Sequence, residues 1–403
     1  RCSRDWSSDV CSSDLIEVIR AASDNEEGKL VANSIYEEKM NHHLSYDHFA
    51  ILYRTNAQSR AFEEALRRMS IPYTIYGGIS FYQRKEIKDL IAYLRLVVNP
   101  RDEESLKRVI NYPARGIGKT TIDKILLIAN EQDVSMWEVL QSAQQKGFRA
   151  GTLEAIDGFV TMIRSFASML QKNNAYDVAV HIGKQTGIVK ELFNDKSTEG
   201  VQRYENIQEL LNSIKEWTES PDNEEGELVD KSLGGYLQQV TLVTDSDEKD
   251  PDADTVKLMT IHAAKGLEFS CVFAAGLEEQ LFPNAMAINT REELEEERRL
   301  FYVVITRAKK RLWVSYANTR YRFGNLVQNE PSRFIEELPE ALLDRSYAGG
   351  GALRDSTPGG WGRGTAFDRL QGARESNNDD RDKSSFYKDR KSTRLNSSHG
   401  YIS

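Results

Sequence analysis

The chain has 403 residues, with 53 Lys and Arg against 62 Asp and Glu, and a formal net charge of −9. This length predicts two or three domains. A hydrophobic content of 39% without a long apolar run excludes a membrane span, and the acidic balance excludes a uniformly basic nucleic-acid binder, although a local basic groove can still bind nucleic acid.

The two ends of the chain, 1–15 and 391–403, have no hydrophobic periodicity, and we interpret both as foreign, adapter-like sequence. Cys2 and Cys11 fall in the first segment, which leaves Cys271 as the one native cysteine. One thiol cannot build a disulfide framework or a zinc cluster, so we expect a cytoplasmic protein with no metal ligands of its own.

Residues 16–100 alternate between strand and helix patterns. Strands are predicted at 48–54 and 73–76, and Asn56 can cap the helix that follows the first of them. The apolar faces of the two predicted helices comprise Phe62, Leu66 and Met69 in one, and Ile87, Leu90, Ile91 and Leu94 in the other.

Residues 101–254 change character, because apolar residues recur at helical spacing and strand-like alternation almost vanishes. We predict an all-helical insertion that ends in the acidic run 245–254. The helical spacing is carried by Leu106, Val109 and Ile110, by Ile122, Ile125 and Leu126, and by Ile207, Leu210, Leu211 and Ile214.

Within this insertion, Arg115-Gly-Ile-Gly-Lys-Thr-Thr121 looks like part of a phosphate-binding P-loop. The full pattern needs a Gly where Pro113 stands and a preceding buried strand, so we reject that interpretation. A turn between helices at Gly116 and Gly118 is favoured. Its exposed amides can hold a duplex phosphate, and a plain helix–helix turn is an equal alternative.

Alternation returns at residue 255, with strands expected at 256–261, 271–275 and 311–316 and a helix at 292–306. Strands separated by helices predict an α/β fold with a parallel sheet covered on both faces. Residues 346–390 are rich in Gly, Ser, Asp and Arg, and we expect a disordered tail. Its scattered Arg residues can add weak DNA affinity, although a solvated linker is the favoured interpretation.

The residues best suited to bind phosphate or nucleotide lie in two segments. These are the loop His262-Ala-Ala-Lys-Gly-Leu-Glu-Phe269 and the helix end Arg298–Ala308. Arg307 closes a helix whose apolar positions are Leu300, Tyr302, Val303 and Ile305, so its planar fork can be presented to a phosphate. Taken alone, it would be a surface Arg paired with a carboxylate. Glu268 can accept hydrogen bonds from ribose hydroxyls, or be a simple helix-end carboxylate.

Together, and in this order, these two segments resemble nucleotide- and DNA-contacting motifs of superfamily 1 DNA helicases of the UvrD/Rep/PcrA type. The resemblance covers residues 16–343 and implies the C-terminal half of a 3′-to-5′ DNA helicase that acts in DNA repair. It implies that residues 16–100 and 255–345 are two parts of a second RecA-like domain and that 101–254 are its helical insertion. The foreign-looking segments 1–15 and 391–403 and the tail 346–390 complete the division of the chain.

The resemblance also implies residue roles. Arg307 would be the catalytic finger on a γ-phosphate, Glu268 a nucleotide contact, and His262 and Lys265 contacts to the single-stranded DNA backbone. Arg54 and Asn56 would touch the same DNA track, and Gly116 and Gly118 the duplex. Ser80 stands where the family commonly has Lys or Arg, so a helix cap is favoured there.

ATP and Mg²⁺ would be held mainly by an N-terminal RecA-like half, which carries the P-loop and the carboxylates. The expected partners are therefore that half, single-stranded and duplex DNA, and repair or transcription proteins, with no membrane. The alternative is a non-catalytic DNA-binding or regulatory module that retains the helicase fold.

Overall fold

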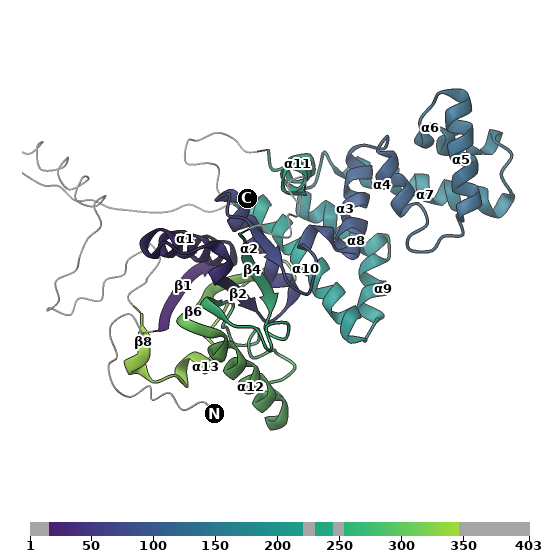
Figure 1. Ribbon diagram of the computed structural model, residues 1–403. Coiled ribbons are helices and arrows are strands. Elements are labelled where there is room, and N and C mark those ends of the chain that lie inside the picture. Colours follow the sequence, from purple (N-terminus) through teal and green to yellow (C-terminus); the bar gives the residue numbers. More distant parts are fainter. Residues whose placement is uncertain (1–15, 221–229, 245–253, 346–403) are drawn as a thin grey trace, which may run out of the picture. The chain divides into compact units, whose positions relative to one another are not determined.

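The computed structural model describes residues 16–220, 230–244 and 254–345, which belong to one compact unit spanning residues 1–351 (Figure 1). The foreign ends predicted at 1–15 and 391–403 and the tail predicted at 346–390 lie outside the described residues. None of the described helices is both long and apolar enough to cross a membrane.

Within the described ranges, the strands form one eight-stranded sheet in the order β3-β4-β2-β5-β6-β1-β8, with β7 paired to β6. All pairings are parallel except the β6–β7 hairpin, which is antiparallel. The strands are β1 (Ile16–Ser23), β2 (Phe49–Tyr53), β3 (Tyr73–Ile75), β4 (Val256–Thr260), β5 (Phe269–Ala274), β6 (Ala308–Arg322), β7 (Asn325–Gln328) and β8 (Leu343–Asp344).

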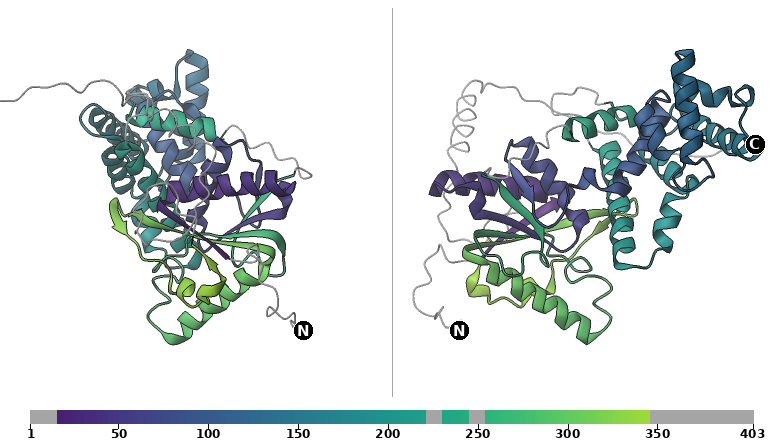
Figure 2. Two further views of the ribbon diagram at one scale, coloured as in Figure 1. Left: turned by 90° about the vertical axis from the view of Figure 1, so that its left-hand side faces the viewer. Right: turned by 45° about the vertical axis from the view of Figure 1, so that its right-hand side comes forward.

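Side chains alternate between the two faces of this sheet, and each face is covered by different helices. On one face Ile51 and Phe273 pack with α1 (Asp24–His42) and α2 (Ser59–Arg68). On the other face Leu52 and Val272 pack with α12 (Arg291–Arg307) and α13 (Arg333–Glu336). Figure 2 shows α1 and α12 on opposite sides of the sheet, which confirms the predicted α/β arrangement.

Residues 101–254 form helices throughout their described part, and we call helices α4–α11 the helical insertion. Its helices are α4 (Glu103–Val109), α5 (Lys119–Gln132), α6 (Met136–Gln141), α7 (Ala150–Met169), α8 (Ala175–Gln185), α9 (Ile188–Asn194), α10 (Thr198–Glu219) and α11 (Leu233–Thr244). Helix α3 (Lys85–Val98) precedes them, and its buried side chains share their core.

Short 3₁₀ turns complete the described chain at η1 (Tyr46–His48), η2 (Asn56–Gln58), η3 (Phe81–Gln83), η4 (Ala143–Gln145) and η5 (Glu340–Leu342). The predicted apolar faces of α3 and α10 are buried, and so is Cys271.

One predicted contact is wrong. Tyr302 is 64% exposed, and α12 is instead anchored by the fully or nearly buried Phe301 and Val304. Leu300, Val303 and Ile305 do pack against this core, so Tyr302 is the one of the four predicted positions that points away from it.

Candidate functional site

The carboxyl ends of β2, β3 and β4 border a groove that contains three of the predicted DNA contacts. Tyr53 and Thr260 are partners in the β2–β4 register, so the residues that follow each strand emerge side by side. Arg54, Asn56 and His262 all line a cavity of about 620 Å³ there, which the start of α10 closes on its other side. Crevices at the carboxyl ends of parallel strands are the usual place for ligands in open α/β sheets.

Arg54 is held in this groove by a carboxylate from the far side of the sheet. Its guanidinium donates to both oxygens of Glu297 on α12, at 2.7 to 3.1 Å. Glu297 is 3% exposed and also accepts from the backbone amide of Asn284. A bidentate pair of this kind fixes the direction of the fork. Arg54 can reach a DNA phosphate only by sharing or leaving Glu297.

Asn56 does not cap α2, which corrects the sequence-based expectation. Its amide donates to Gln202 of α10 at 3.3 Å, and its backbone lies inside η2. The side-chain oxygen of Gln58 instead accepts from the backbone amides of Arg54 and Thr55, at 2.9 and 2.8 Å. The longer Gln side chain can fold back onto the turn, which leaves Asn56 directed at the groove.

Ser80 occupies the N-cap position of η3 but makes no side-chain cap bond. Its buried hydroxyl donates to Glu63 of α2 at 2.5 Å, and Glu63 also accepts from the amide of Phe81. The expectation of a side-chain cap at Ser80 is therefore wrong. The hydroxyl satisfies a buried carboxylate whose pKa is raised by burial.

His262 is exposed at the groove, and its pKa is lowered first by partial desolvation of the ring and then by the nearby positive charge of Arg54. It is therefore neutral near pH 7 and gains a charge in mildly acidic solution. Lys265 lies three residues further on, exposed to solvent and outside the residues that line the cavity. The structure thus brings together Arg54, Asn56 and His262, while Lys265 stands on the outer part of the same loop.

Glu268 and Arg307 lie at the opposite edge of the sheet, where β5 and β6 begin. Phe269 and Ala308 are register partners, and Glu268 and Arg307 immediately precede them. Arg307 donates to the Leu267 carbonyl at 2.7 Å, to the Val303 carbonyl at 3.2 Å and to the Thr306 hydroxyl at 3.1 Å. Its guanidinium is therefore half-buried and engaged by its own chain.

Glu268 is more accessible than Arg307. Its carboxylate is 56% exposed and lies 3.6 Å from the ammonium group of Lys309. A carboxylate and an arginine side by side at one edge suit a ribose hydroxyl and a phosphate. Among the described residues, no group of three or more His, Cys, Asp or Glu side chains is arranged to hold a metal ion.

Residues 261–268 form the connection between these two edges. The loop leaves the carboxyl end of β4, passes β2, and enters the amino end of β5. Ala264, at its centre, is fully buried, and Gly266 has a φ of +90° that a side chain would strain. The loop is therefore a short, packed link between the groove residue His262 and the edge residue Glu268.

The turn at Gly116 and Gly118 belongs to the helical insertion and is flanked by helices α4 and α5, as predicted. Gly116 has a φ of +82°, and Gly118 begins α5. Asn111 accepts from the amides of Arg115 and Ile117, which shapes the turn from within. Gly118 and the first residues of α5 are exposed, so their amides remain accessible to an anion.

Phe323, which was not among the residues predicted from the sequence, stands at the turn of the β6–β7 hairpin. It is 66% exposed with a φ of +52°, and it lines a second cavity of about 270 Å³. Thr55, Asn284 and Met286 line both cavities, so the two are neighbours. An apolar residue beside Gly324 at a turn between polar strand residues was the available sequence signal.

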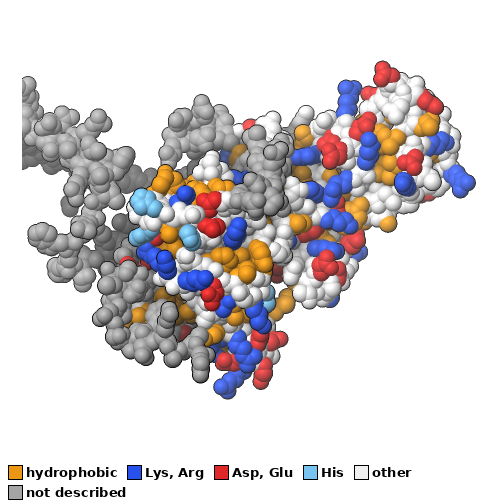
Figure 3. All heavy atoms as spheres, in the orientation of Figure 1, with side chains coloured by type: hydrophobic (Ala, Val, Ile, Leu, Met, Phe, Trp, Pro, Cys, Tyr) orange, Lys and Arg blue, Asp and Glu red, His pale blue; other side chains and the backbone are white. Residues whose placement is uncertain are grey.

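Positive side chains are not gathered into one field on the face of the molecule that Figure 3 displays. Figure 3 shows Lys and Arg interspersed with Asp and Glu across the face that it displays. A mixed surface agrees with the net charge of −9. With this net charge, local groups such as those around the groove can still attract a polyanion.

Comparison with known proteins gives a family match. The model of the UvrD-like helicase C-terminal domain matches residues 3–319, a range that begins within the predicted foreign segment 1–15. The chain is 40% identical over 336 residues to an ATP-dependent DNA helicase PcrA of Staphylococcus epidermidis, covering 82% of this chain and 45% of that protein. It is 38% identical to a protein of the same name from Staphylococcus aureus strain Mu50, covering 83% and 45%. The chain spans about half the length of the curated relatives it matches.

Proposed function

This chain belongs to the UvrD-like helicase C-terminal domain family, and from that premise we propose that it is the C-terminal half of a 3′-to-5′ DNA helicase driven by ATP. The whole protein would translocate on single-stranded DNA and unwind duplex in DNA repair, in the cytoplasm. The observation that carries this proposal is the loop 261–268, which links the groove lined by Arg54, Asn56 and His262 at one edge of the sheet to Glu268 and Arg307 at the other.

At the amino edge, Glu268 would bind the ribose and Arg307 the γ-phosphate of ATP, with Mg²⁺ and the remaining phosphates held by the N-terminal RecA-like half. ATP with Mg²⁺ supplies the phosphoryl group whose transfer releases the free energy. An arginine presented from a neighbouring domain stabilises charge on the transferring group. The end of α12 and the bond to the Leu267 carbonyl hold Arg307 at this edge of the sheet, which supports the proposed role.

That bond offers a route for coupling. To reach a phosphate, Arg307 would exchange the Leu267 carbonyl for the stronger anionic acceptor. Leu267 lies in the loop 261–268, so its release changes the restraint on the segment that also bears His262 and Lys265. Nucleotide binding and DNA grip would thereby be linked through one short piece of backbone.

In the groove, Arg54, Asn56, His262 and Lys265 would contact phosphates of the single strand. Contacts to phosphates position DNA without reading its sequence, as a translocating motor requires. The exposed ring of Phe323 would offer a surface for base stacking. The turn at Gly116 and Gly118 would hold a duplex phosphate, and repair or transcription proteins would be further partners.

The test restores the missing half. The full chain is purified and mixed with a separately produced N-terminal RecA-like half, and ATP hydrolysis is measured with and without single-stranded DNA. We expect no hydrolysis by the chain alone and DNA-stimulated hydrolysis by the pair, reduced by about 10³-fold or more in Arg307→Ala. Arg299→Ala is the matched control, since that side chain on the same helix is 75% exposed.

The alternative is a non-catalytic DNA-binding or regulatory module, and one observation favours it. The guanidinium of Arg307 already donates three hydrogen bonds within its own chain, as a purely structural arginine would. DNA binding without hydrolysis from any pairing would support this module. Hydrolysis that survives Arg307→Ala would remove the residue from the proposed mechanism.

A further inference from the structure

Helix α10 has an apolar face and a polar face, and most of the polar face is also buried. Its apolar residues Ile207, Leu210 and Ile214 lie in the core of the helical insertion. On the opposite face, polar side chains recur every three or four residues, which places them in one row along the helix. That row consists of Glu209, Asn212, Glu216 and Glu219.

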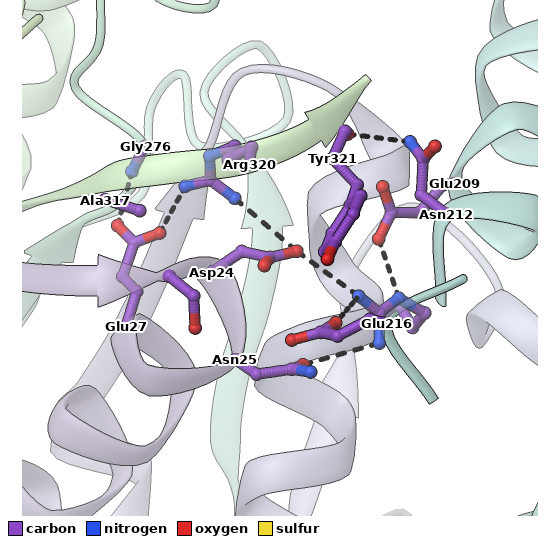
Figure 4. A network of polar contacts seen from close by, with 12 residues as sticks. Asp24, Asn25, Glu27, Glu209, Asn212, Glu216, Gly276, Ala317, Arg320 and Tyr321 are labelled. Atoms are coloured by element: carbon purple, nitrogen blue, oxygen red, sulfur yellow. Dashed lines mark hydrogen bonds and ion pairs between the residues drawn. The ribbon is translucent and has the colours of Figure 1, made fainter. Parts of the chain in front are cut away.

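This polar row packs against α2 and β6, and Glu219 at its end is 46% exposed. Glu209 accepts from the buried Arg60 of α2 at 2.6 Å, and Glu219 accepts from the Tyr321 hydroxyl on β6. Figure 4 shows Asn212 directed toward Tyr321, with Glu209 and Glu216 beside it. The row is therefore the seam between the helical insertion and the end of the longest strand.

Asn212 makes the most specific contact in this row. It is 8% exposed, and its side-chain amide donates to the Tyr321 carbonyl at 2.8 Å (Figure 4). Its side-chain oxygen accepts from the backbone amide of Gly324 at 3.2 Å. One side chain thus holds the backbone on both sides of Phe323, using its donor and its acceptor together.

The hairpin turn has little else to fix it. The β6–β7 ladder ends at the pair formed by Arg322 and Asn325, which leaves Phe323 and Gly324 beyond it. Gly324 has a φ of +77°, and a β-carbon there would lie 1.8 Å from the Tyr176 hydroxyl of α8. The turn therefore rests directly on two helices of the insertion, α8 and α10.

The strand below the turn is anchored differently. Arg320 is buried and binds Glu278 of the loop after β5, at 2.7 to 2.9 Å, and Glu27 of α1. These partners belong to the sheet and its covering helix, not to the insertion. Arg320 is therefore bound by residues of the sheet and of α1, whereas the turn at Gly324, four residues later, is bound by residues of the helical insertion.

We propose that Asn212 is a positioning residue that fixes the ring of Phe323 to the helical insertion, so that a displacement of α10 displaces the stacking surface for DNA. The role of Phe323 in DNA contact rests on the proposed function. The grip of Asn212 on the turn does not. Asn212 is the α10 side chain that hydrogen-bonds the backbone of this turn, so a shift of α10 is expected to be transmitted to Phe323 through it.

The first experiment measures the grip without DNA. Hydrogen exchange at the Gly324 amide is followed in the full chain by mass spectrometry with residue-level fragmentation. Asn212→Ala removes the acceptor of that amide, so its exchange is expected to accelerate about tenfold, the equivalent of one net hydrogen bond. Asn212→Asp retains an oxygen for the Gly324 amide and is expected to restore most of the protection.

Asn206→Ala is the matched control. Asn206 is the same residue type on the same helix, 2% exposed, but its amide donates to Glu86 of α3 at 2.7 Å and not to the hairpin. Exchange at Gly324 should remain at the parent rate in this variant. Equal exchange in the parent and Asn212→Ala would overturn the proposal, as would acceleration of equal size in Asn206→Ala.

The second experiment tests whether the hydrogen bonds of Asn212 to the hairpin turn affect stacking of a DNA base on Phe323. A forked DNA carrying 2-aminopurine at the junction is titrated with the full chain, and quenching reports stacking on an aromatic ring. Phe323→Ala and Asn212→Ala should each lose at least half of the quenching. Full quenching by Asn212→Ala would overturn the proposal. If the parent chain itself gives no quenching, the proposed DNA role of Phe323 fails, and the exchange rates alone decide whether Asn212 holds the turn.

Discussion

Replacing Arg60 by Met removes a buried cation that pairs with four carboxylates between α2 and α10. We expect this substitution to lower the free energy of unfolding. The Arg60 side chain is 2% exposed. It lies 2.6 Å from Glu209, 3.3 Å from both Asp24 and Glu64, and 3.9 Å from Glu216. Burial alone would lower the pKa of Arg60, but these four carboxylates hold it well above its usual value.

The expected magnitude follows from the charges that remain. Met fills the aliphatic volume of the lost side chain, yet the four carboxylates are left close together without their shared cation. Removing one partner from a buried ion network costs about 3–5 kcal/mol. Arg68→Met on the same helix is the matched control, because its 50% exposed side chain lies 3.7 Å from Glu64 and such surface pairs contribute less than about 1 kcal/mol.

The cost should depend on pH with a definite sign. Burial raises the pKa of Glu216 to about 7, Asp24 adds to the rise, and Arg60 opposes it. A raised carboxyl pKa favours the folded state below the ordinary value of 4.5, and this contribution is lost as the pH rises through about 7. Without Arg60 the pKa rises further, so the folded variant takes up protons near neutrality. The cost of Arg60→Met should then be smaller at pH 6 than at pH 8, by about 1–3 kcal/mol.

The assay is urea denaturation of the full chain at pH 6 and pH 8, followed by circular dichroism, for the parent, Arg60→Met and Arg68→Met. Glu216→Gln in the Arg60→Met background should recover part of the loss at pH 8. A cost below about 1 kcal/mol at pH 8 would refute the reasoning, because it would mean that the carboxylates are not confined together. A cost that grows toward pH 6 would refute the assigned direction of the Glu216 pKa.

Three further predictions concern DNA binding by the full chain. Lys265→Ala should weaken single-strand binding and reduce the slope of log affinity against log salt by about 0.7, whereas Lys39→Ala on α1 should leave the slope unchanged; an unchanged slope in Lys265→Ala would exclude a phosphate contact. Because burial and Arg54 lower the pKa of His262, single-strand affinity should rise about three- to tenfold as the pH falls from 7 to 5, and the rise should vanish in His262→Gln. Glu297→Gln should loosen Arg54 and tighten DNA binding about three- to tenfold, while Glu296→Gln, 62% exposed on the same helix, should have less effect; tighter binding in neither variant would count against Arg54 as a DNA contact.

Much of the architecture followed from local pattern. The strand β2 was predicted within one residue at each end, and the apolar stripes of α3 and α10 are buried as expected. These successes share a cause, since periodicity along the chain reports which side of an element is apolar. The wrong predictions at Asn56, Ser80 and Tyr302 also have a common cause. Each depended on which neighbour the side chain meets, and the competing partners, such as Gln58 and Glu63, were as plausible locally as the residues chosen.

The sequence by itself determined the kinds of elements, the two motifs that identify the family, and the rejection of a P-loop at Gly116 and Gly118. Only the tertiary structure decided which of those residues meet. Arg54 binds Glu297 across 243 positions of the chain, and Asn212 grips Tyr321 across 109. The physical reason is that the register of parallel strands and the packing of α10 determine these encounters. Both arise from the simultaneous burial of many distant side chains, which leaves no trace in the periodicity of any one segment.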